Sequence, residues 1–473
     1  MRLFGAMVNT GRPSRDCAPC KKRKLRCDLQ ATGCGQCHRA GLLCYGYLDP
    51  SQLLIRDQTR ATEQKVLARQ SPGNALPPVL QVGWLVRARN TFFSLYVFGL
   101  SRSYHVLAPL CAKATETGHL WSCVDAVSLA LMSFQSGSPA ILHMARKKYV
   151  DSIRKVSHAV QDPTLSLNDE TLQSVLLLDL YEKMVNRNPQ SLESWTSHIG
   201  GAMSLIKARG TRNISSPVAC QLSFRLSVTL PISYGLARLE IPGELIGLLR
   251  DLDPYITGIK KDFTSITVDT FMLKSDIDRG RISSLEAVHR AQKIRSHLIA
   301  FEAAIPLSLG PQSVMCPDPC ILGTPWDIYP DHFTAQIWTA LRFHRLAMDD
   351  IIQIQGSEDM FLSEDAFRDI EIVVGQICAA VPQFILPGFW PGNEIPFSPL
   401  QRLRCCVILA PLFIVAQLSR NPGIRSWAIQ ILENIAQNGN LRMAGEIALL
   451  LREATPIDYW TVYAMSGSYA LAA

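Results

Sequence analysis

Apolar residues from position 83 to the end of the chain recur mostly with the 3.6-residue period of a helix rather than with the alternation of a strand. This part of the chain is also rich in helix-forming residue types and long enough to bury a large core. Residues 168–185 carry two apolar stripes, formed by Leu172, Val175 and Leu176 and by Leu177, Leu180, Tyr181 and Met184. A helix that is apolar around most of its circumference belongs inside a protein. The pattern therefore predicts a large all-α domain.

A second amphipathic pattern follows, with apolar residues on one face at Trp195, Ile199, Ala202, Met203 and Ile206. Gly200-Gly201 would let another backbone approach this helix, and Lys207, Arg209 and Gly210 are typical of a helix C-terminus. His198 lies on the apolar face, which favours a buried or interface histidine over a catalytic base.

Two segments of this domain that contain cysteines are expected to have structural roles only. Residues 405–415 are strongly apolar, but they are too short for a membrane span and are interrupted by Pro411, so they predict a core helix. The segment Cys316-Pro317-Asp318-Pro319-Cys320 has no partner Cys-x-x-Cys and only His332 nearby, and it predicts a proline-rich loop. The sequence contains no P-loop, dinucleotide fingerprint, G-x-S-x-G or H-E-x-x-H motif, and no nucleophilic triad is supported. We therefore expect that the protein is not an enzyme.

The chain before residue 83 has a different composition. Residues 48–69 are mixed and polar, and the Pro- and Gly-containing residues 70–78 predict a break, with a domain boundary near residue 80. Heptad steps from Leu54 place Ala61 and Ala68 at a, with polar residues at d, so a coiled-coil dimer is not supported.

Six cysteines near the N-terminus repeat the pattern C-x2-C-x6-C, with the second copy displaced by 17 residues: Cys17, Cys20, Cys27, Cys34, Cys37 and Cys44. Thiolates in C-x2-C pairs are zinc ligands. Two separate tetrahedral sites would need eight sulfurs, so two metal ions require two shared sulfurs. A disulfide framework is disfavoured because no segment resembles a signal peptide, and a metal-storage module would need more cysteine than this chain has.

Basic residues distinguish the two copies. Lys21, Lys22, Arg23, Lys24 and Arg26 lie between the second and third cysteines, whereas residues 38–43 of the second copy are nearly neutral. Residues 1–50 hold nine Lys and Arg and three Asp, which is a net +6 of the chain's +7. A polyanion is the natural partner of such a module. A short helix following Cys20 would present Lys21 to Arg26 to the DNA major groove, where Lys and Arg donate to guanine O6 and N7. The same run also suits a nuclear-import signal.

The stretch from Gly11 through Tyr47, continuing to residues 56–59, resembles the fungal zinc binuclear cluster (Zn2Cys6) transcription factors. The later motif Trp195-x2-His198-x2-Gly201-Ala202-x2-Leu205-Ile206-x2-Arg209-Gly210 resembles the helical regulatory domain that follows many such clusters. The resemblance implies two Zn²⁺ ions bridged by Cys17 and Cys34. It also implies base reading at Arg23 and Lys24, and DNA targets with CGG-type triplets. In that family a proline commonly precedes the fourth cysteine, whereas this chain has Ala31-Thr32-Gly33.

Taken together, these patterns predict an N-terminal arm (1–16), a Zn2Cys6 DNA-binding domain (17–47), a linker (48–82) and an all-α regulatory domain (83–473). The expected function is a nuclear, sequence-specific transcription factor for RNA polymerase II genes that binds double-stranded DNA and no membrane. A homodimer, a small-molecule effector and contact with the transcription machinery remain open. The alternative is an enzyme or ligand-binding helical protein fused to a zinc module.

Overall fold

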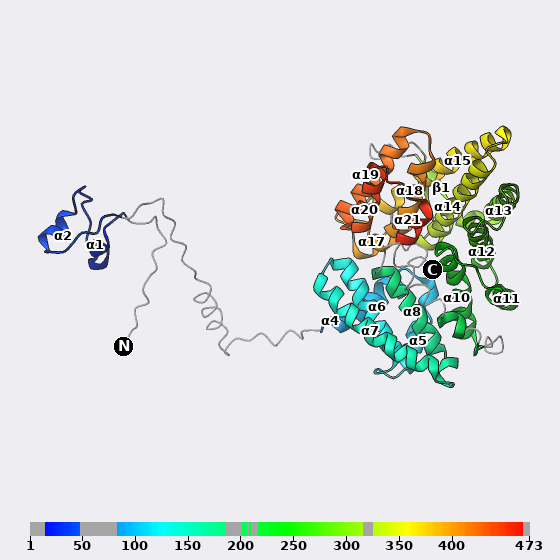
Figure 1. Cartoon of the computed structure of the whole chain (residues 1–473), viewed down its shortest axis with the longest axis horizontal. Coiled ribbons are helices and arrows are strands. Elements are labelled where there is room, and N and C mark those ends of the chain that lie inside the picture. Colours follow the sequence, from blue (N-terminus) through cyan, green and yellow to red (C-terminus); the bar gives the residue numbers. More distant parts are fainter. Residues whose placement is uncertain are drawn as a thin grey trace. The chain divides into compact units, whose positions relative to one another are not determined.

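The computed structural model describes residues 15–47, 83–185, 201–205, 208–209, 216–315 and 325–466. The chain divides into two compact units, Met1–Gln81 and Val82–Ala473 (Figure 1). Among its described residues the first unit has two short helices, α1 (Ala18–Arg23) and α2 (Gly35–Arg39). The predicted linker and its heptad positions lie outside the described residues, so the boundaries within residues 1–82 stay predictions.

The second unit is built almost entirely of helices. Its early helices are α4 (Trp84–Thr91), which continues into the π-helical η1 (Phe92–Phe98), α5 (Leu107–Lys113), α6 (His119–Ser136), α7 (Pro139–Gln161) and α8 (Asp169–Val185). The middle helices are α10 (Pro217–Leu236), α11 (Gly243–Leu252), α12 (Ile259–Asp278) and α13 (Ser284–Ala304). Short 3-10 turns connect them at η2 (Arg102–Tyr104), η3 (Leu165–Leu167), η6 (Asp253–Tyr255) and η7 (Leu307–Leu309).

The late helices complete this unit. They are α14 (His332–Gln355), α15 (Met360–Ala380), α16 (Pro382–Ile385), α17 (Pro399–Cys405), α18 (Leu409–Leu418), α19 (Pro422–Gly439), α20 (Arg442–Arg452) and α21 (Tyr459–Ser466), with the 3-10 turn η8 (Cys406–Ile408) between α17 and α18.

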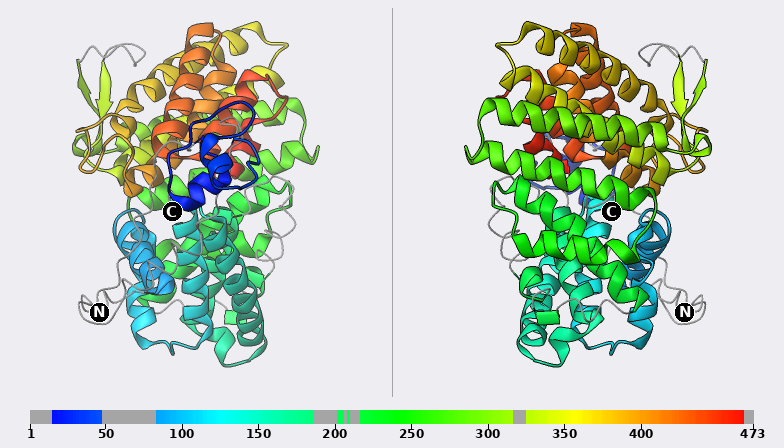
Figure 2. Two further views of the ribbon diagram at one scale, coloured as in Figure 1. Left: turned by 90° about the vertical axis from the view of Figure 1, so that its left-hand side faces the viewer. Right: turned by 90° about the vertical axis from the view of Figure 1, so that its right-hand side faces the viewer.

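The helices of this unit pack against one another. Helix α6 packs against α7 and α8, α13 and α15 flank α14, and α18 contacts α14, α15, α19, α20 and α21. Figure 2 shows the early helices at one end of the helical unit and the late helices at the other, with the green middle helices between them. A single apolar core runs from Ala88 to Ala464 through this unit.

A recurring sequence signal starts four of these helices. Ser138, Ser216, Ser398 and Asn421 each precede a proline, and each side chain accepts a hydrogen bond from a backbone N–H in the first turn of its helix. The proline suits the first helical position because its fixed φ matches the helix and its missing N–H would have no partner there. The sequence therefore specifies these helix starts locally.

The segment 168–185, which the apolar pattern predicts as a buried helix, forms a buried helix in the structure. Helix α8 buries most of its residues, including both predicted stripes. Of the amphipathic pattern that follows, Trp195, His198 and Ile199 lie outside the described residues. Ala202, Met203 and Leu205 are buried, and the buried guanidinium of Arg209 pairs with Asp169 at the start of α8, with 2.5 Å between Nη2 and Oδ1.

The apolar stretch around Pro411 is interior. Within the described residues, the helical stretch Pro399–Leu418 is long and apolar enough to cross a membrane, yet 78% of the 18-residue window that meets this criterion is buried inside the helical unit. Residues 405–415 are all buried, which confirms their predicted core position. They are not one helix, however, because the 3-10 turn η8 separates the end of α17 from the start of α18. The segment from Cys316 to Cys320 lies outside the described residues. His332 is buried against the rings of Phe384 and Trp390.

One feature departs from a purely helical domain. Strands β1 (Gln312–Val314) and β2 (Trp326–Ile328) form an antiparallel pair in the register Gln312–Ile328. Trp326 is buried, and the carboxylate of Asp327 pairs with the buried guanidinium of Arg342 on α14 at 3.1 Å. A three-residue strand is too short to show alternation, which is why the apolar pattern did not predict it.

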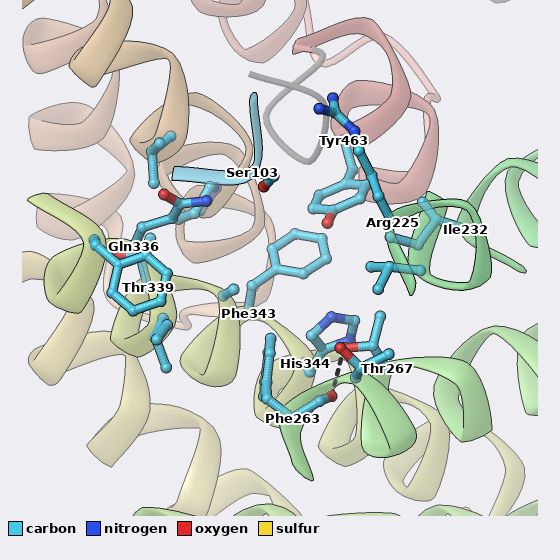
Figure 3. A pocket seen from close by; sticks show the side chains of 17 residues that line it. Ser103, Arg225, Ile232, Phe263, Thr267, Gln336, Thr339, Phe343, His344 and Tyr463 are labelled. Atoms are coloured by element: carbon cyan, nitrogen blue, oxygen red, sulfur yellow. Dashed lines mark hydrogen bonds between the residues drawn. The ribbon is translucent and has the colours of Figure 1, made fainter. Parts of the chain in front are cut away.

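A cavity of about 120 Å³ lies inside the helical unit, lined by residues of α10, α12, α14 and α21 (Figure 3).

Candidate metal centre and nucleic-acid interface

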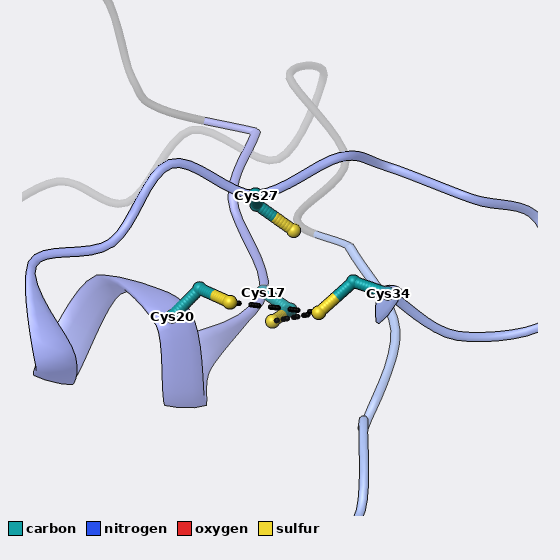
Figure 4. A group of neighbouring side chains, drawn as sticks. All are labelled: Cys17, Cys20, Cys27 and Cys34. Carbon is teal, nitrogen blue, oxygen red and sulfur yellow. Dashed lines mark hydrogen bonds between the residues drawn. The ribbon is translucent and has the colours of Figure 1, made fainter. Parts of the chain in front are cut away.

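The six predicted cysteines come together in two overlapping groups of four. Cys17, Cys20, Cys27 and Cys34 form one group, and Cys17, Cys34, Cys37 and Cys44 form the other. Within each group the sulfur atoms all lie within 4.8 Å of one another. Figure 4 shows the side chains of the first group converging from α1 and from the chain that follows it. The two groups share Cys17 and Cys34, which are the bridging residues that the family resemblance implies.

The sulfur spacing suits metal ions rather than disulfides. Cys17 Sγ lies 3.5 Å from Cys34 Sγ and 3.6 Å from Cys37 Sγ, and Cys20 Sγ lies 3.5 Å from Cys34 Sγ. A disulfide needs about 2.05 Å between the sulfurs. Tetrahedral zinc with Zn–S bonds of about 2.3 Å places them roughly 3.8 Å apart. Each group therefore offers the four soft, closely spaced donors that a zinc ion takes.

These cysteines also replace an apolar core. Five of them form the buried cluster of the first unit, and among residues 15–47 only Cys44 and Tyr47 are partly buried hydrophobic residues packed against it. A module with so little apolar surface to bury depends on its metal for stability.

The cysteine repeat is also a repeat of backbone structure. Each helix begins directly after the first cysteine of its copy: the N–H of Lys21 donates to the carbonyl of Cys17 at 3.0 Å, and that of His38 to Cys34 at 3.1 Å. One turn of helix then brings the second cysteine of each C-x2-C pair beside the first.

The two helices end in the same way. The N–H of Leu25 donates to the carbonyl of Cys20, as Leu42 does to Cys37, and both distances are 3.0 Å. Between these residues stand Lys24, with φ 55°, and Gly41, with φ 61°. This is the Schellman ending, whose left-handed residue is usually glycine because it lacks a Cβ. The first copy holds a lysine in that conformation.

The helix that carries the basic residues lies three residues earlier than the sequence predicted. It was expected to follow Cys20 and to present Lys21 to Arg26, but α1 begins at Ala18 and ends at Arg23. Pro19 favours an early start because it suits the first turn, and the Schellman ending stops the helix before Lys24. All five basic residues are exposed. The earlier position of α1 changes which of them lie on the helix, but all five remain accessible to a partner.

Burial raises the pKa of three of the thiols, those of Cys17, Cys20 and Cys37, which therefore need positive charge nearby to ionise. The pKa of Cys20 rises to about 12. Burial also acts to raise the pKa of Cys34, but hydrogen bonds from the thiol and the backbone N–H of Cys37 outweigh it and lower that pKa to about 6. Divalent cations supply the charge that turns such thiols into thiolate ligands.

Two hydrogen-bonded contacts that the sequence did not single out brace the cluster. Both carboxylate oxygens of Asp28 accept a hydrogen bond from the N–H of Gly35, at 2.9 and 3.1 Å, at the start of α2. The hydroxyl of Tyr47 donates to the carbonyl of Gln30. The position of Asp28 directly after the ligand Cys27 could have indicated its contact with α2. Nothing in the sequence indicated the contact of Tyr47 with Gln30.

The connection before Cys34 is made without proline. Gly33 has φ 117°, a conformation that the ring of proline, with φ near −65°, cannot adopt. Proline could therefore not stand directly before Cys34 in this structure.

Comparison with protein families finds two matches. The fungal Zn(2)-Cys(6) binuclear cluster domain matches residues 15–54, and the fungal specific transcription factor domain matches residues 89–233. The first matched range contains both four-sulfur groups, and the second runs from α4 into α10. Searches of curated proteins and of solved structures found no match. A domain of the first kind binds two zinc ions. The chain thus contains a fungal Zn(2)-Cys(6) binuclear cluster domain followed by a fungal specific transcription factor domain.

Proposed function

We propose that this transcription factor acts in the nucleus on RNA polymerase II genes, where its zinc cluster reads CGG-type triplets in the DNA major groove and its helical unit regulates the outcome. Both matched domain families are transcription factor families, not enzyme families. The concentration of positive charge on the first 50 residues supports a polyanionic partner.

The six cysteines would hold the two zinc ions in the two groups described above. One ion would take Cys17, Cys20, Cys27 and Cys34, and the other Cys17, Cys34, Cys37 and Cys44. The zinc ions would supply positive charge to the thiolates, and the cysteines that flank and form part of α1 would hold this helix against them. The protein's part is to present the side chains of α1 in one orientation.

The observation that carries the proposal is the conformation of Lys24. A non-glycine residue with left-handed backbone costs about 1–2 kcal/mol, and the same position of the second copy is occupied by Gly41. Backbone strain that persists in one copy and is relieved in the other points to a use for the strained side chain. Lys24 is exposed and stands at the end of α1, where it would reach a guanine edge.

The other exposed cations of the module would contact the DNA backbone or share in reading. Lys21 and Lys22 lie in the last turn of α1, Arg23 is the other position at which the resemblance implies base reading, and Arg26 precedes the third cysteine. Phosphate contacts position a protein on the duplex, while contacts with base edges give sequence preference.

Selection from a random duplex library tests the proposal. The zinc-loaded full-length chain at physiological salt should enrich duplexes with CGG-type triplets, because specific binding exceeds nonspecific binding by about 10³-fold or more. The same chain with its zinc chelated serves as the control and should enrich none. Binding of all duplexes alike by the zinc-loaded chain would contradict base reading and favour a ligand-binding helical protein with an incidental zinc module.

A further inference from the structure

The cavity inside the helical unit is a candidate ligand site. Its walls come from four helices that are far apart in the sequence, α10, α12, α14 and α21, with contributions from η2, η8 and α18. Its volume is about 120 Å³, close to the roughly 150 Å³ of an engineered apolar cavity that binds benzene. The size therefore suits a small molecule of about one ring.

Most of the wall is apolar. Phe263 on α12, Phe343 on α14 and Ile232 on α10 all contribute to it (Figure 3). Ligand sites are typically apolar clefts with a few polar groups that fix orientation. The body of a matching ligand would therefore be aromatic or branched aliphatic.

A buried cation forms part of the same wall. Arg225 on α10 is 7% exposed, and its guanidinium lies over the ring of Tyr104, with Cζ 3.2 Å from the ring centroid. Within the described residues, Nε and Nη1 of Arg225 are buried without a hydrogen-bond partner, and no carboxylate pairs with the guanidinium, which instead hydrogen-bonds to the buried hydroxyl of Tyr96. A buried charge that no opposite charge neutralises carries a desolvation cost. A bound anion would offset that cost.

A carboxylate that acts on the neighbouring Tyr96 and Tyr104 already has a cationic partner. Asp179 on α8 pairs with the buried ammonium of Lys183, with 2.6 Å between Oδ2 and Nζ. The positive charges of Lys183 and Arg225 act on each other, since Arg225 helps to lower the pKa of Lys183 after the larger effect of burial. Asp179 is thus the ion-pair partner of Lys183 and not of Arg225, which favours an anion at Arg225.

The other side of the cavity is neutral. His344 on α14 is buried among the rings of Phe263, Phe271, Phe343 and Trp460, and burial lowers the pKa of its imidazole to about 4. In the view of Figure 3, Arg225 lies above the ring of Phe343 and His344 below it. The cavity therefore has one cationic side and one apolar, aromatic side.

We propose that this cavity binds a small monocarboxylate with an aromatic or branched aliphatic body, the carboxylate held by Arg225 and the body packed on Phe263 and Phe343. The proposal does not rest on DNA reading, because the event to be measured is binding to the chain itself. Charge, burial and shape all point to the same ligand class.

Calorimetric titration of the zinc-loaded full-length chain with benzoate and with its neutral isostere benzamide tests this. Benzoate should bind one per chain and about 10–100-fold more tightly than benzamide, since a hydrogen bond to a charged group is worth about 1.5–3 kcal/mol. Arg225→Met should remove that preference and leave benzamide binding within a few-fold. Arg442→Met, a change at a side chain that is 92% exposed, is the matched control and should alter neither affinity.

A second variant keeps the test decisive if Arg225→Met fails to fold. Ala340→Leu places extra volume on the cavity wall formed by α14 and should abolish binding of both probes while the far-ultraviolet circular dichroism stays helical. Three outcomes would overturn the proposal: no benzoate binding to the unmodified chain, equal benzoate affinity in the folded Arg225→Met variant, or unchanged affinity in the Ala340→Leu variant.

Discussion

Single residues decide how the two copies of the cysteine repeat differ. Lys24 and Gly41 occupy equivalent left-handed positions, yet only glycine adopts that conformation without cost. The first copy thus gives up local stability to place a basic side chain at the end of its helix. The second copy keeps the more stable residue and has no comparable basic run.

Replacing Lys24 with glycine should therefore stabilise the cluster while weakening its DNA preference. Relief of the strain is worth about 1 kcal/mol, and because folding and metal binding are coupled it should appear as about fivefold tighter zinc retention. Competition with a chelator measures it. The matched change is Gly41→Ala, where no atom lies within 4 Å of the added Cβ, so that only backbone strain acts. Looser zinc retention in Lys24→Gly than in the unmodified chain would show that the position is not strained.

Burial of His344 should make the stability of the helical unit depend on pH. The folded pKa of His344 is about 4, below the unfolded value of about 6.5. As pH falls below 6.5 the unfolded chain takes up this proton first, so the free energy of unfolding drops by about 1.4 kcal/mol per pH unit from this group until pH 4. His344→Gln should remove that part of the acid destabilisation.

Urea unfolding at several pH values between 4 and 7 measures the difference between His344→Gln and the unmodified chain. His289→Gln, a change at an exposed histidine of α13, is the control and should leave the pH dependence as it is. A His344→Gln variant that loses stability with acid as steeply as the unmodified chain would contradict the neutral, buried state of this side chain.

At the scale of elements, local sequence signals and burial patterns account for most of the helices. The Ser-Pro and Asn-Pro pairs start α7, α10, α17 and α19, and the all-round apolar pattern of residues 168–185 becomes the buried helix α8. The extent of α1 was not predictable in the same way. Its ending depends on a left-handed lysine, and nothing in the residue type of Lys24 indicates that conformation.

The interior position of α18 gives a direct prediction for packing. Leu412 in this helix is fully buried, whereas Leu449 in α20 is 52% exposed. Leu412→Ala should reduce the free energy of unfolding by about 2–5 kcal/mol because it removes buried methyl groups and leaves a cavity. Leu449→Ala, the same change on a helix surface, should cost less than about 1 kcal/mol. Denaturant unfolding compares the two, and equal costs would mean that α18 is not a core helix.

At the scale of the whole molecule, the two units are stabilised in different ways. The first unit has a buried cluster made of cysteines, whereas the second has a continuous apolar core. The sequence predicted this division because cysteine spacing and helical periodicity are both visible in residue order. It could not predict the cavity at Arg225, whose walls come from distant helices, or the β1–β2 pair.

Removal of zinc should separate the two units. In the full-length chain a chelator should abolish DNA binding and the structure around α1 and α2, while the helical signal of the second unit persists, because none of the six cluster cysteines lies there. Elemental analysis before chelation should give two zinc ions per chain. Circular dichroism follows the helices, and a loss of most helicity on chelation would mean that the two units fold as one.

Cys17→Ala and Cys34→Ala should be the most damaging single changes to zinc binding, since each removes a sulfur from both groups.

The most direct test of base reading compares Lys24→Ala with Lys21→Ala on matched and scrambled duplexes across a salt series. Lys24→Ala should cost about 1–3 kcal/mol on the preferred site only and flatten preference at one base pair. Lys21→Ala should weaken all duplexes alike and lower the slope of log K against log salt by about 0.9. If Lys24→Ala instead weakens every duplex equally, then Lys24 contacts phosphate and the account of its strained position as a base-reading device is wrong.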